Sequence, residues 1–518
     1  MNQLLIGAST FTAAILALGV AGAGAARAAA PETTRVVVAF KPGAAAPVKA
    51  AVGAARGQVK RDLPGMNAIA VEIPARALRG LRNNPQIEFI EEDVKRYPLA
   101  LAAPSNKPYL PGQLVPYGIR MVQADQLPDN YAANRMVCII DSGYDRAHED
   151  LAGNSASGVY DAGTGWWHTD ENHHGTHVAG TVAAINNSGT GVVGVAPNRQ
   201  LRLHIVKVFG AEGWAYSSTL AAAANQCGSA GANVISMSLG GARPSQLEIR
   251  AFMALASKGV LSVAAAGNDG NRAISYPAGY PSVVMVGALD QNKAWAAFSQ
   301  FNSKVELSAP GVGVLSTVPM GGGAEASLTV GRSAYAPGTM AGSPFASASA
   351  PLADFGLGDA VDAALNGKVC LIARGSVDFA TKVANCQRSG GVAAVVYNNV
   401  PGGFSGTLGA TVTSIPSVSA ADTEGAAMMG QLGQLATVAV KPVHYAYYDG
   451  TSMATPHVAA VAALVWSYFP SCTAAQLRSS LGKSAQDLGA PGRDERYGHG
   501  LVQAKAAYDR INTLGCGN

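Results

Sequence analysis

The chain has 518 residues, of which 48% are hydrophobic and 14% are charged, and its formal net charge is +4. A chain of this length is expected to fold into several domains. Its charged fraction is low beside the value of about 25% found in typical globular proteins. Because the net charge is small and the sequence holds no dense cluster of Lys and Arg, we expect no nucleic-acid partner.

The first 30 residues predict a secretion signal. Residues 4–24 are apolar or small, and the small-residue triplets ARA (26–28) and AAA (28–30) are candidate cleavage sites. No Lys or Arg precedes the apolar run, which nearly reaches the length that spans a bilayer, so a membrane anchor is the alternative. We expect export, removal of residues 1–30 and no membrane span in the secreted product.

Residues 31–102 have the pattern of a separate small α+β unit. Apolar periodicity predicts strands at 35–40, 67–73 and 87–91 and helices at 46–56 and 75–83. The stretch 97–111, rich in Pro and Ala, is a candidate processing region. The alternative to a segment that is removed is a permanent N-terminal domain.

Three short stretches carry groups suited to nucleophilic catalysis. Ser452 precedes a long apolar run, which predicts a serine at a helix N-terminus, where backbone N–H groups favour negative charge. Asp141 ends an apolar strand pattern, and parallel sheets place their ligands at such strand ends. His174 belongs to a histidine cluster that runs into a second helix pattern. Each feature alone is commoner in turns, caps or structural histidine pairs, but together they favour an enzyme.

Several motifs of the chain resemble those of the subtilisin-like serine proteases. They are IIDSGYD (139–145), HGTHVAGTVAA (174–184), VISMSLGG (234–241), VAAAGNDG (263–270) and GTSMATPHVAA (450–460). The resemblance implies an α/β peptidase domain at 103–518, with a mostly parallel sheet and helices on both faces. It also implies that Asp141 orients His174, which takes the proton of Ser452 as this nucleophile forms an acyl-enzyme. His173 and His177 do not match the catalytic position, and we expect His177 to pack beneath the site.

The same resemblance implies the oxyanion and substrate contacts. Asn268 matches a side-chain donor that would hold the oxyanion together with the N–H of Ser452, although a turn residue is the alternative. An edge segment that would pair with an extended peptide, giving affinity with little sequence choice, is formed by Ser238, Leu239 and Gly240. The pocket for the side chain before the cut would be lined by Ala264, Ala265 and Gly267. These small residues predict broad specificity for protein and peptide substrates, and Asp269 is a weaker candidate for favouring a basic residue at this pocket.

Two further regions resemble accessory units of the family. The segment 73–93 resembles the inhibitory propeptide, which implies that residues 31–102 assist folding and block the cleft until they are removed. Residues 321–442 resemble the protease-associated domain that is inserted in many secreted relatives. Within them the sequence predicts strands at 367–374, 392–397 and 415–419 and a helix at 379–389. Such an insertion would screen the cleft or contact large substrates; an inert surface insertion is the alternative.

Six cysteines in an exported chain predict disulfides. Cys370 and Cys386 both lie in the insertion and form the best pair, and Cys472 with Cys516 would tie down the C-terminus. Cys138 and Cys227 remain, unless Cys138 is a free buried thiol.

A structural calcium ion is implied by the resemblance, whereas catalysis needs no cofactor. Asp150 and Asn187 resemble positions of a family calcium site, and their oxygens suit this hard cation. The loop is one residue longer here, and turn capping is the alternative.

We therefore expect a secreted, monomeric serine endopeptidase that its own propeptide inhibits. A catalytically silent binding protein would require a broken triad, and an esterase would not need a strand-binding segment. A dedicated processing enzyme would have a narrow, charged pocket. Met453 lies beside the nucleophile, so its oxidation is expected to reduce activity.

Overall fold

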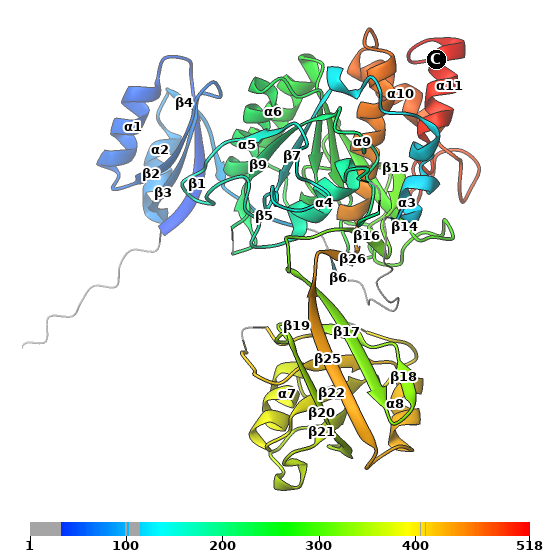
Figure 1. Ribbon diagram of the computed structural model, residues 1–518. Helices are drawn as coiled ribbons and strands as arrows, with labels where there is room; N and C mark the ends of the chain where they lie inside the picture. Colours follow the sequence, from blue (N-terminus) through cyan, green and yellow to red (C-terminus); the bar gives the residue numbers. More distant parts are fainter. Residues whose placement is uncertain are drawn as a thin grey trace, which may run out of the picture.

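The structure is a computed structural model that describes residues 33–98, 101–102, 114–187, 189–210, 212–404, 406–409 and 411–518. The predicted signal segment and most of the predicted processing region 97–111 lie outside the described residues. Figure 1 shows a small N-terminal unit beside a central α/β unit, and a second sheet domain that hangs from the central unit by a pair of strands.

A seven-stranded sheet forms the centre of the molecule. Its order is β15-β14-β13-β11-β7-β9-β8, and every pairing in it is parallel. The strands are β7 (Met136–Asp141), β8 (Ala156–Gly158), β9 (Arg202–Lys207), β11 (Val234–Met237), β13 (Leu261–Ala265), β14 (Val283–Leu289) and β15 (Val305–Pro310). A parallel sheet covered on both faces buries every position of its inner strands, which explains the unbroken apolar runs of β7 and β13.

Helices cover both faces of this sheet, so the predicted α/β class is confirmed. Val137 and Ile139 of β7 share one apolar core with α4 (His174–Ala183) and α9 (Thr451–Tyr468). Cys138 and Ile140 point to the other face, whose core includes α5 (Ser217–Ser229) and α6 (Gln246–Ser257). The remaining helices of this unit are α3 (Tyr117–Met121), η2 (Ala124–Gln126), η3 (Ala132–Asn134), α10 (Ala474–Ser484) and α11 (Ala504–Leu514).

The N-terminal unit is a four-stranded antiparallel sheet in the order β2-β3-β1-β4. Its elements are β1 (Thr33–Phe40), α1 (Ala45–Ala54), β2 (Gln58–Leu63), β3 (Ala68–Pro74), η1 (Ala75–Ala77), α2 (Leu78–Arg82) and β4 (Ile87–Glu92). Alternate residues of β1 face opposite ways: Val38 packs with α1, and Val37 packs with α5 and α6 of the central unit. The sequence missed β2, because its segment QVKRDL is largely polar.

The chain that leaves the N-terminal unit continues as a strand on the central unit. Strand β5 (Lys95–Pro98) lies antiparallel between β10 (Ala215–Tyr216) and β12 (Leu239–Gly240). After residues 99 and 100, β6 (Leu101–Ala102) pairs with β26 (Tyr445–Asp449), the strand that leads into α9. The described chain therefore ends β5 beside Leu239 and resumes on the strand that leads into α9.

The inserted domain contains a nine-stranded sheet in the order β18-β17-β25-β20-β21-β22-β24-β19-β23. It joins the central unit through β16 (Val314–Thr317), which pairs with β26. Its elements are β17 (Gly323–Val330), β18 (Ser333–Tyr335), β19 (Gly338–Ala341), β20 (Ala346–Asp354), η4 (Ala363–Leu365), β21 (Val369–Ala373), α7 (Phe379–Arg388), β22 (Ala393–Tyr397), β23 (Gly406–Thr407), β24 (Ser417–Ala420), α8 (Asp422–Met429) and β25 (Leu435–Val443). The four predicted elements correspond to β21, α7, β22 and β24, whereas the strands and helix that flank them were not predicted.

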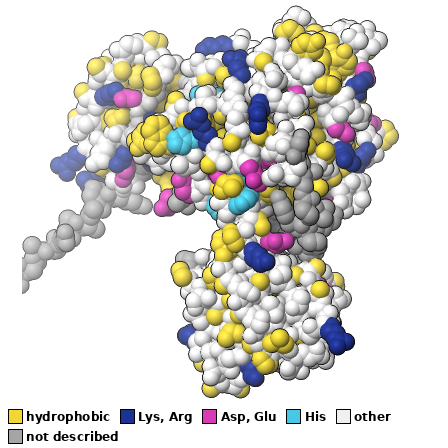
Figure 2. Space-filling view, in the orientation of Figure 1, with side chains coloured by type: hydrophobic (Ala, Val, Ile, Leu, Met, Phe, Trp, Pro, Cys, Tyr) yellow, Lys and Arg dark blue, Asp and Glu magenta, His cyan; other side chains and the backbone are white. Residues whose placement is uncertain are grey.

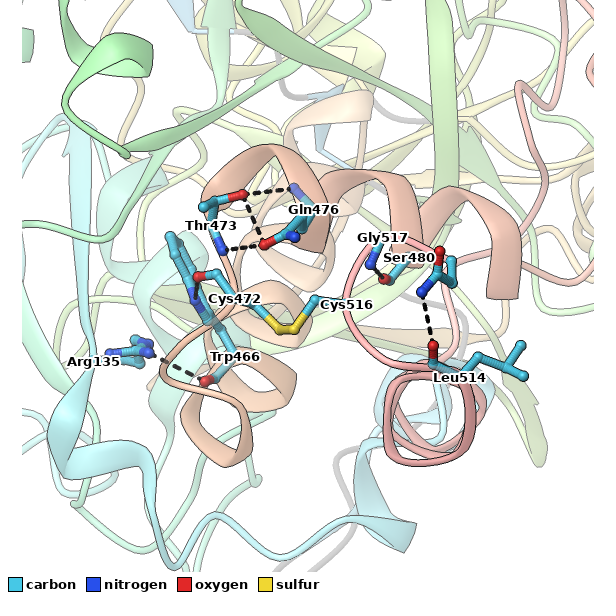
Figure 3. Close-up of a disulfide and its surroundings, with 10 residues drawn as sticks. Arg135, Trp466, Cys472, Thr473, Gln476, Ser480, Leu514, Cys516 and Gly517 are labelled. Atoms are coloured by element: carbon cyan, nitrogen blue, oxygen red, sulfur yellow. Dashed lines mark hydrogen bonds between the residues drawn. A yellow bond between two sulfur atoms is a disulfide. The ribbon is translucent and has the colours of Figure 1, made fainter.

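All six cysteines form disulfides, in the pairs Cys138–Cys227, Cys370–Cys386 and Cys472–Cys516. The alternative of a free thiol at Cys138 is therefore wrong. Figure 3 shows the bond between Cys472, at the start of α10, and Cys516, after α11.

Among the described residues, no helix combines the length and apolarity needed to cross a membrane. On the face drawn in Figure 2, Lys and Arg side chains are spread over all three units.

Candidate active site

Asp141 and His174 form a buried hydrogen-bonded pair at the carboxyl end of the central sheet. His174 Nδ1 lies 2.7 Å from Asp141 Oδ1, and Asp141 has no exposed surface. Burial by itself lowers the pKa of His174, but the charge and hydrogen bond of Asp141 and the charge of Asp170 outweigh it and raise the pKa above the ordinary histidine value. The pair therefore favours the protonated imidazole, which is the form that a general base adopts after it accepts a proton.

A second carboxylate, Asp170, holds the turn that leads into α4. Its oxygens accept hydrogen bonds from Ser142 Oγ, from the backbone N–H groups of residues 172, 173 and 176, and from Thr176 Oγ1. His173, the residue before the helix, has a φ of 71° and so adopts the left-handed conformation. Asp170 thus fixes a strained helix start and contributes negative charge near His174.

Ser452 lies in the first turn of α9 and has no exposed surface. Its Oγ donates to the carbonyl of Ser238 at 3.0 Å, while Ser238 Oγ donates to the carbonyl of Ser452 at 2.7 Å. His174 Nε2 has no hydrogen-bond partner in the part of the chain that the structure describes. The structure thus joins Asp141 to His174 directly and places Ser452 on a helix packed against the one that His174 begins, without a serine–histidine hydrogen bond.

Asn268 is anchored to the residue before the nucleophile. Its Oδ1 accepts from the backbone N–H of Thr451 at 3.0 Å and from Thr451 Oγ1 at 2.9 Å, and Gly267 N–H donates to the same hydroxyl at 3.1 Å. These bonds orient the amide, because the oxygen that accepts them leaves the NH2 group on the opposite side. Gly267 has a φ of 109°, which favours glycine, and a Cβ there would meet Gln300.

Two further histidines of this region, His177 and His457, are buried. His177 Nε2 lies 3.0 Å from the carbonyls of Val314 and Ala446, and burial lowers its pKa to about 3. His457 Nδ1 lies 2.8 Å from the carbonyl of Met453, and burial lowers its pKa to about 4. Both are therefore neutral at physiological pH, in keeping with the expectation that His177 packs beneath the site.

The chain matches the profile of the Subtilase family over residues 133–354 and 392–500, which is more than half of its length. It belongs to the subtilase family. The subtilases are serine endopeptidases that need no cofactor for catalysis, and the insertion matches the PA domain profile at residues 331–428.

Individual relatives agree with this assignment. An alkaline protease of Alkalihalobacillus alcalophilus is 39% identical over 255 residues, which are 48% of this chain and 62% of the relative's length. Subtilisin NAT of Bacillus subtilis subsp. natto is 35% identical over 271 residues and is covered to 67%. Among solved structures, the psychrophilic subtilisin-like protease Apa1 of Pseudoalteromonas sp. AS-11 is 42% identical, with a TM-score of 0.58. The aligned region comprises 78% of this chain and 100% of the Apa1 chain. Fervidolysin of Fervidobacterium pennivorans, at 23% identity and a TM-score of 0.60, shares the fold.

The predicted substrate-binding segment of this subtilase is already engaged by its own chain. Leu239 lies opposite Pro98, and Gly240 lies opposite Tyr97, in antiparallel register with β5. The predicted pocket residues Ala264 and Ala265 sit in β13 with no exposed surface in this form of the chain.

The N-terminal unit docks through carboxylates at two helix N-termini. Glu91 accepts hydrogen bonds from Ser245 Oγ and from the N–H groups of residues 246 and 247, at the start of α6. Asp93 accepts from Ser217 Oγ, Ser218 N–H and Ser218 Oγ at the start of α5. Both carboxylates satisfy N–H groups that a helix start leaves open and oppose the positive end of the helix dipole.

The predicted calcium ligands bind one another. Asp150 Oδ1 accepts from Asn187 Nδ2 and Oδ2 accepts from the Val192 N–H, each at 2.7 Å. Within the described residues no group of three or more His, Cys, Asp or Glu side chains is placed to hold a metal ion. As arranged, the Asn187 amide, the Val192 N–H and the Tyr445 hydroxyl all bond to the Asp150 carboxylate, which fits the turn-capping alternative. Calcium at this loop stays a prediction that melting in EDTA and in excess calcium would test.

The sequence interpretation missed several residues of this region. Asp170 carried a weak signal, since an acid four residues before His174 is placed to cap the helix start. No such signal marked Glu91, Asp93 or the buried pair of Arg96 and Glu248. In the sequence each of them looks like an ordinary surface charge, because its partner is distant along the chain.

Proposed function

We propose that this subtilase is a secreted serine endopeptidase that hydrolyses peptide bonds through an acyl-enzyme. In this proposal Asp141, His174 and Ser452 form the triad, and the oxyanion binds to the Asn268 amide and the Ser452 N–H. Residues 1–30 are the signal peptide, 31–102 the inhibitory propeptide and 103–518 the peptidase domain, which carries the PA insertion at 321–442.

The proposal rests on the position of strand β5 between two strands of the central unit. A segment of peptide lies antiparallel between β10 and β12, the latter formed by Leu239 and Gly240. The next residue toward the nucleophile, Ser238, exchanges hydrogen bonds with Ser452. Main-chain pairing of this kind binds an extended peptide largely independently of its sequence, which favours a peptidase over an esterase.

Each group then has a defined task. Ser452 Oγ attacks the peptide carbonyl as His174 Nε2 takes its proton, and His174 passes that proton to the leaving amine. Asp141 holds the imidazole with Nδ1–H toward its carboxylate, so that Nε2 is the basic atom. Water then hydrolyses the acyl-enzyme with His174 as base, which regenerates Ser452. The oxyanion of each tetrahedral intermediate is held by the two donors.

The N-terminal unit would inhibit by occupying the substrate's place. Its sheet packs on α5 and α6, its two carboxylates cap these helices, and β5 fills the groove. Pro98 lies opposite Leu239, and the chain resumes at Leu101 opposite Asp449, on the strand that leads into α9. We therefore expect the first self-processing cut between Pro98 and Leu101, and a monomeric product.

Covalent labelling tests the proposal. A fluorophosphonate should modify Ser452 in the purified processed enzyme, as mapped by mass spectrometry, and phosphonate-treated enzyme should lose caseinolytic activity. A Ser452→Ala chain should accumulate as uncut precursor, whereas Ser479→Ala, a control on α10, should mature normally. Labelling at another residue, or normal trimming of the Ser452→Ala chain, would reject the assignment.

A further inference from the structure

Arg96, in the strand that occupies the substrate groove, is the feature that the proposed function leaves unexplained. Its side chain is 1% exposed although it carries a charge. Its Nη2 donates to Glu248 Oε2 at 2.6 Å, and Nη1 lies 3.3 Å from the carbonyl of Lys95. Arginine is rarely buried unless it is paired, so the central unit must offer a site built to receive a cation.

The receiving site consists entirely of residues of the central unit. Glu248 lies in the first turn of α6 and has no exposed surface. Tyr280 OH donates to the same carboxylate oxygen at 2.7 Å and accepts from the N–H of Ser245 at 2.8 Å. The other oxygen, Glu248 Oε1, has no hydrogen-bond partner within the described residues. When the N-terminal unit leaves, this carboxylate stays at the bottom of the pocket without a cation.

The pocket is shaped around the guanidinium and the strand that carries it. Gly241 follows β12, and a Cβ at this position would lie 2.7 Å from the carbonyl of Lys95 and 3.1 Å from Arg96 Nη1. Only a residue without a side chain lets the strand and the arginine approach this closely. Three apolar core residues lie next to these groups: Ala215 is opposite Arg96, Leu239 pairs with β5, and the Phe252 ring lies 6.3 Å from that of Tyr280. Such neighbours keep the surroundings of the ion pair apolar.

The register of β5 gives the distance from this pocket to the reaction centre. Arg96 lies opposite Ala215, and Pro98 lies opposite Leu239. In a substrate strand of the same register, the residue opposite Ser238 is the third after the arginine. Because Ser238 exchanges hydrogen bonds with Ser452, the bond that follows this residue is the one presented to the nucleophile.

From this geometry we infer that the processed enzyme selects substrates with an arginine at the fourth residue before the cleaved bond, and that Glu248 is the residue that determines this specificity. The inference rests on the proposed function and names a substrate class for the same cleft. It departs from the broad specificity expected from the sequence, since an ionised buried carboxylate without its cation costs free energy that a cationic side chain relieves. Arginine suits it better than lysine, because the guanidinium presents several N–H groups in a fixed plane.

The charge of the carboxylate is consistent with this role. Burial is the largest influence and leaves the pKa of Glu248 above its ordinary value, while the charge and hydrogen bond of Arg96 and the hydrogen bond of Tyr280 oppose this rise. A bound arginine therefore favours the ionised form, and the ionised form favours arginine. An exposed carboxylate would be hydrated and would distinguish charged from neutral side chains only weakly.

A peptide series on the processed enzyme tests the inference. Internally quenched peptides of one sequence would carry arginine, its neutral isostere citrulline, lysine or leucine at the fourth residue before the cut, and a second set would move the arginine to the third or fifth residue. We expect kcat/KM for the arginine peptide to exceed that for citrulline by about tenfold or more, with lysine intermediate and no gain at the other positions. Glu248→Gln should bring the ratio of arginine to citrulline close to one. Asp125→Asn, an exposed carboxylate in η2, should leave the ratio unchanged.

Each other outcome has a defined meaning. Equal cleavage of the arginine and citrulline peptides by the wild-type enzyme would overturn the inference while leaving the proposed function standing, and this comparison does not depend on the folding of any variant. An arginine preference that survives in Glu248→Gln would overturn the role of Glu248. If no peptide is cleaved and the fluorophosphonate does not label Ser452, the proposed function and this inference both fail.

Discussion

Ser452 and Ser238 exchange two hydrogen bonds, so the nucleophile is tied to the strand-binding segment rather than to His174. The hydroxyl of Ser452 donates to a backbone carbonyl, which any residue at 238 would supply, whereas the hydroxyl of Ser238 supports the first turn of α9. A bound substrate brings a backbone N–H to the same segment. Competition for the Ser238 carbonyl would then free the Ser452 hydroxyl to turn toward the imidazole.

Ser238→Ala tests which of the two bonds matters. We expect the free energy of unfolding to fall by about 1 kcal/mol, the usual worth of one hydrogen bond. The kcat of the processed enzyme should change less than about tenfold, because the accepting carbonyl remains. Chemical denaturation and active-site-titrated kinetics measure the two effects. A loss of kcat far beyond tenfold would show that the Ser238 hydroxyl takes part in the reaction itself.

The raised pKa of His174 predicts the acid limit of activity. Catalysis requires the neutral imidazole, so kcat/KM falls as the pH drops through the pKa of His174. The midpoint of this acid limb of the pH–rate profile should lie above the pKa of an ordinary histidine. In Asp141→Asn the attractive charge is gone and burial dominates, so the limb should move to lower pH. The kcat of this variant at the plateau of the profile should be about 10⁴-fold below that of the wild type, which is the loss that replacing the triad aspartate by asparagine causes in a serine protease of unrelated fold.

A pH–rate profile of the two processed enzymes with one small substrate measures this. As a control, Asp145→Asn alters another carboxylate near the start of α4, one that bonds to the N–H groups of residues 147 and 320. Its acid limb should keep the wild-type position. An Asp141→Asn limb at unchanged or higher pH would contradict the assignment of the pKa shift to Asp141.

Asn268→Ala should slow the chemical step and leave substrate binding nearly intact. Its amide is oriented by Thr451, the neighbour of the nucleophile, and would bond the oxyanion only as charge develops. We expect kcat to drop about 10²–10³-fold with KM little changed, which is the loss that removal of the corresponding donor causes in subtilisin. Steady-state kinetics at several substrate concentrations separates the two constants, and a change confined to KM would speak against an oxyanion role.

The sequence predicted the central fold, for a physical reason, whereas the triad stays a prediction. Parallel strands buried on both faces have continuous apolar runs, and Asp141 stands at the end of one of them. The insertion was predicted less completely. Strand β20 has the sequence ASASAPLAD and β17 has GAEASLTV, and small residues without a strict alternation carry no clear strand signal.

The charged contacts between units could not be predicted at all. Arg96 and Glu248 are 152 residues apart in sequence, and neither lies in a pattern that implies burial. Pairs of this kind form when two folded units pack against each other. The local hydrophobic pattern of a single sequence does not show how such units pack.

Asp93 is expected to stabilise the precursor more than its neighbour Glu92 does. Asp93 is buried against the start of α5 and pairs with Arg35, whereas the pair of Glu92 with Arg243 is exposed on both sides. In a Ser452→Ala background, which keeps the precursor intact, Asp93→Asn should lower the free energy of unfolding by about 1–3 kcal/mol. Glu92→Gln is the matched control and should have almost no effect, because exposed ion pairs contribute little.

Thermal melts of the two precursor variants decide this prediction. In a chain that retains Ser452, the Asp93→Asn change should speed the release of active enzyme, since a more weakly bound N-terminal unit dissociates from the groove sooner. Equal melting temperatures for the Asn and Gln variants would show that capping of α5 does not hold the N-terminal unit in place.

The Cys472–Cys516 disulfide should act on stability and not on catalysis. It closes a segment of 44 residues and ties the end of α11 to the start of α10, where Gly517 N–H also donates to Ser480 Oγ (Figure 3). Replacing both cysteines by serine should lower the free energy of unfolding by about 2–4 kcal/mol, because the unfolded chain regains the freedom that the bond removes. The carbonyl of Cys472 accepts a hydrogen bond from Trp466, which lies near the C-terminal end of α9, whereas Ser452 lies in the first turn of that helix. The kcat at low temperature should therefore stay near the wild-type value. Denaturation curves and the half-life of activity on heating measure the loss, with Ser484→Ala on α10 as a control that leaves the disulfide in place. An unchanged half-life would mean that the packing of α10 and α11 holds the C-terminus without the bond.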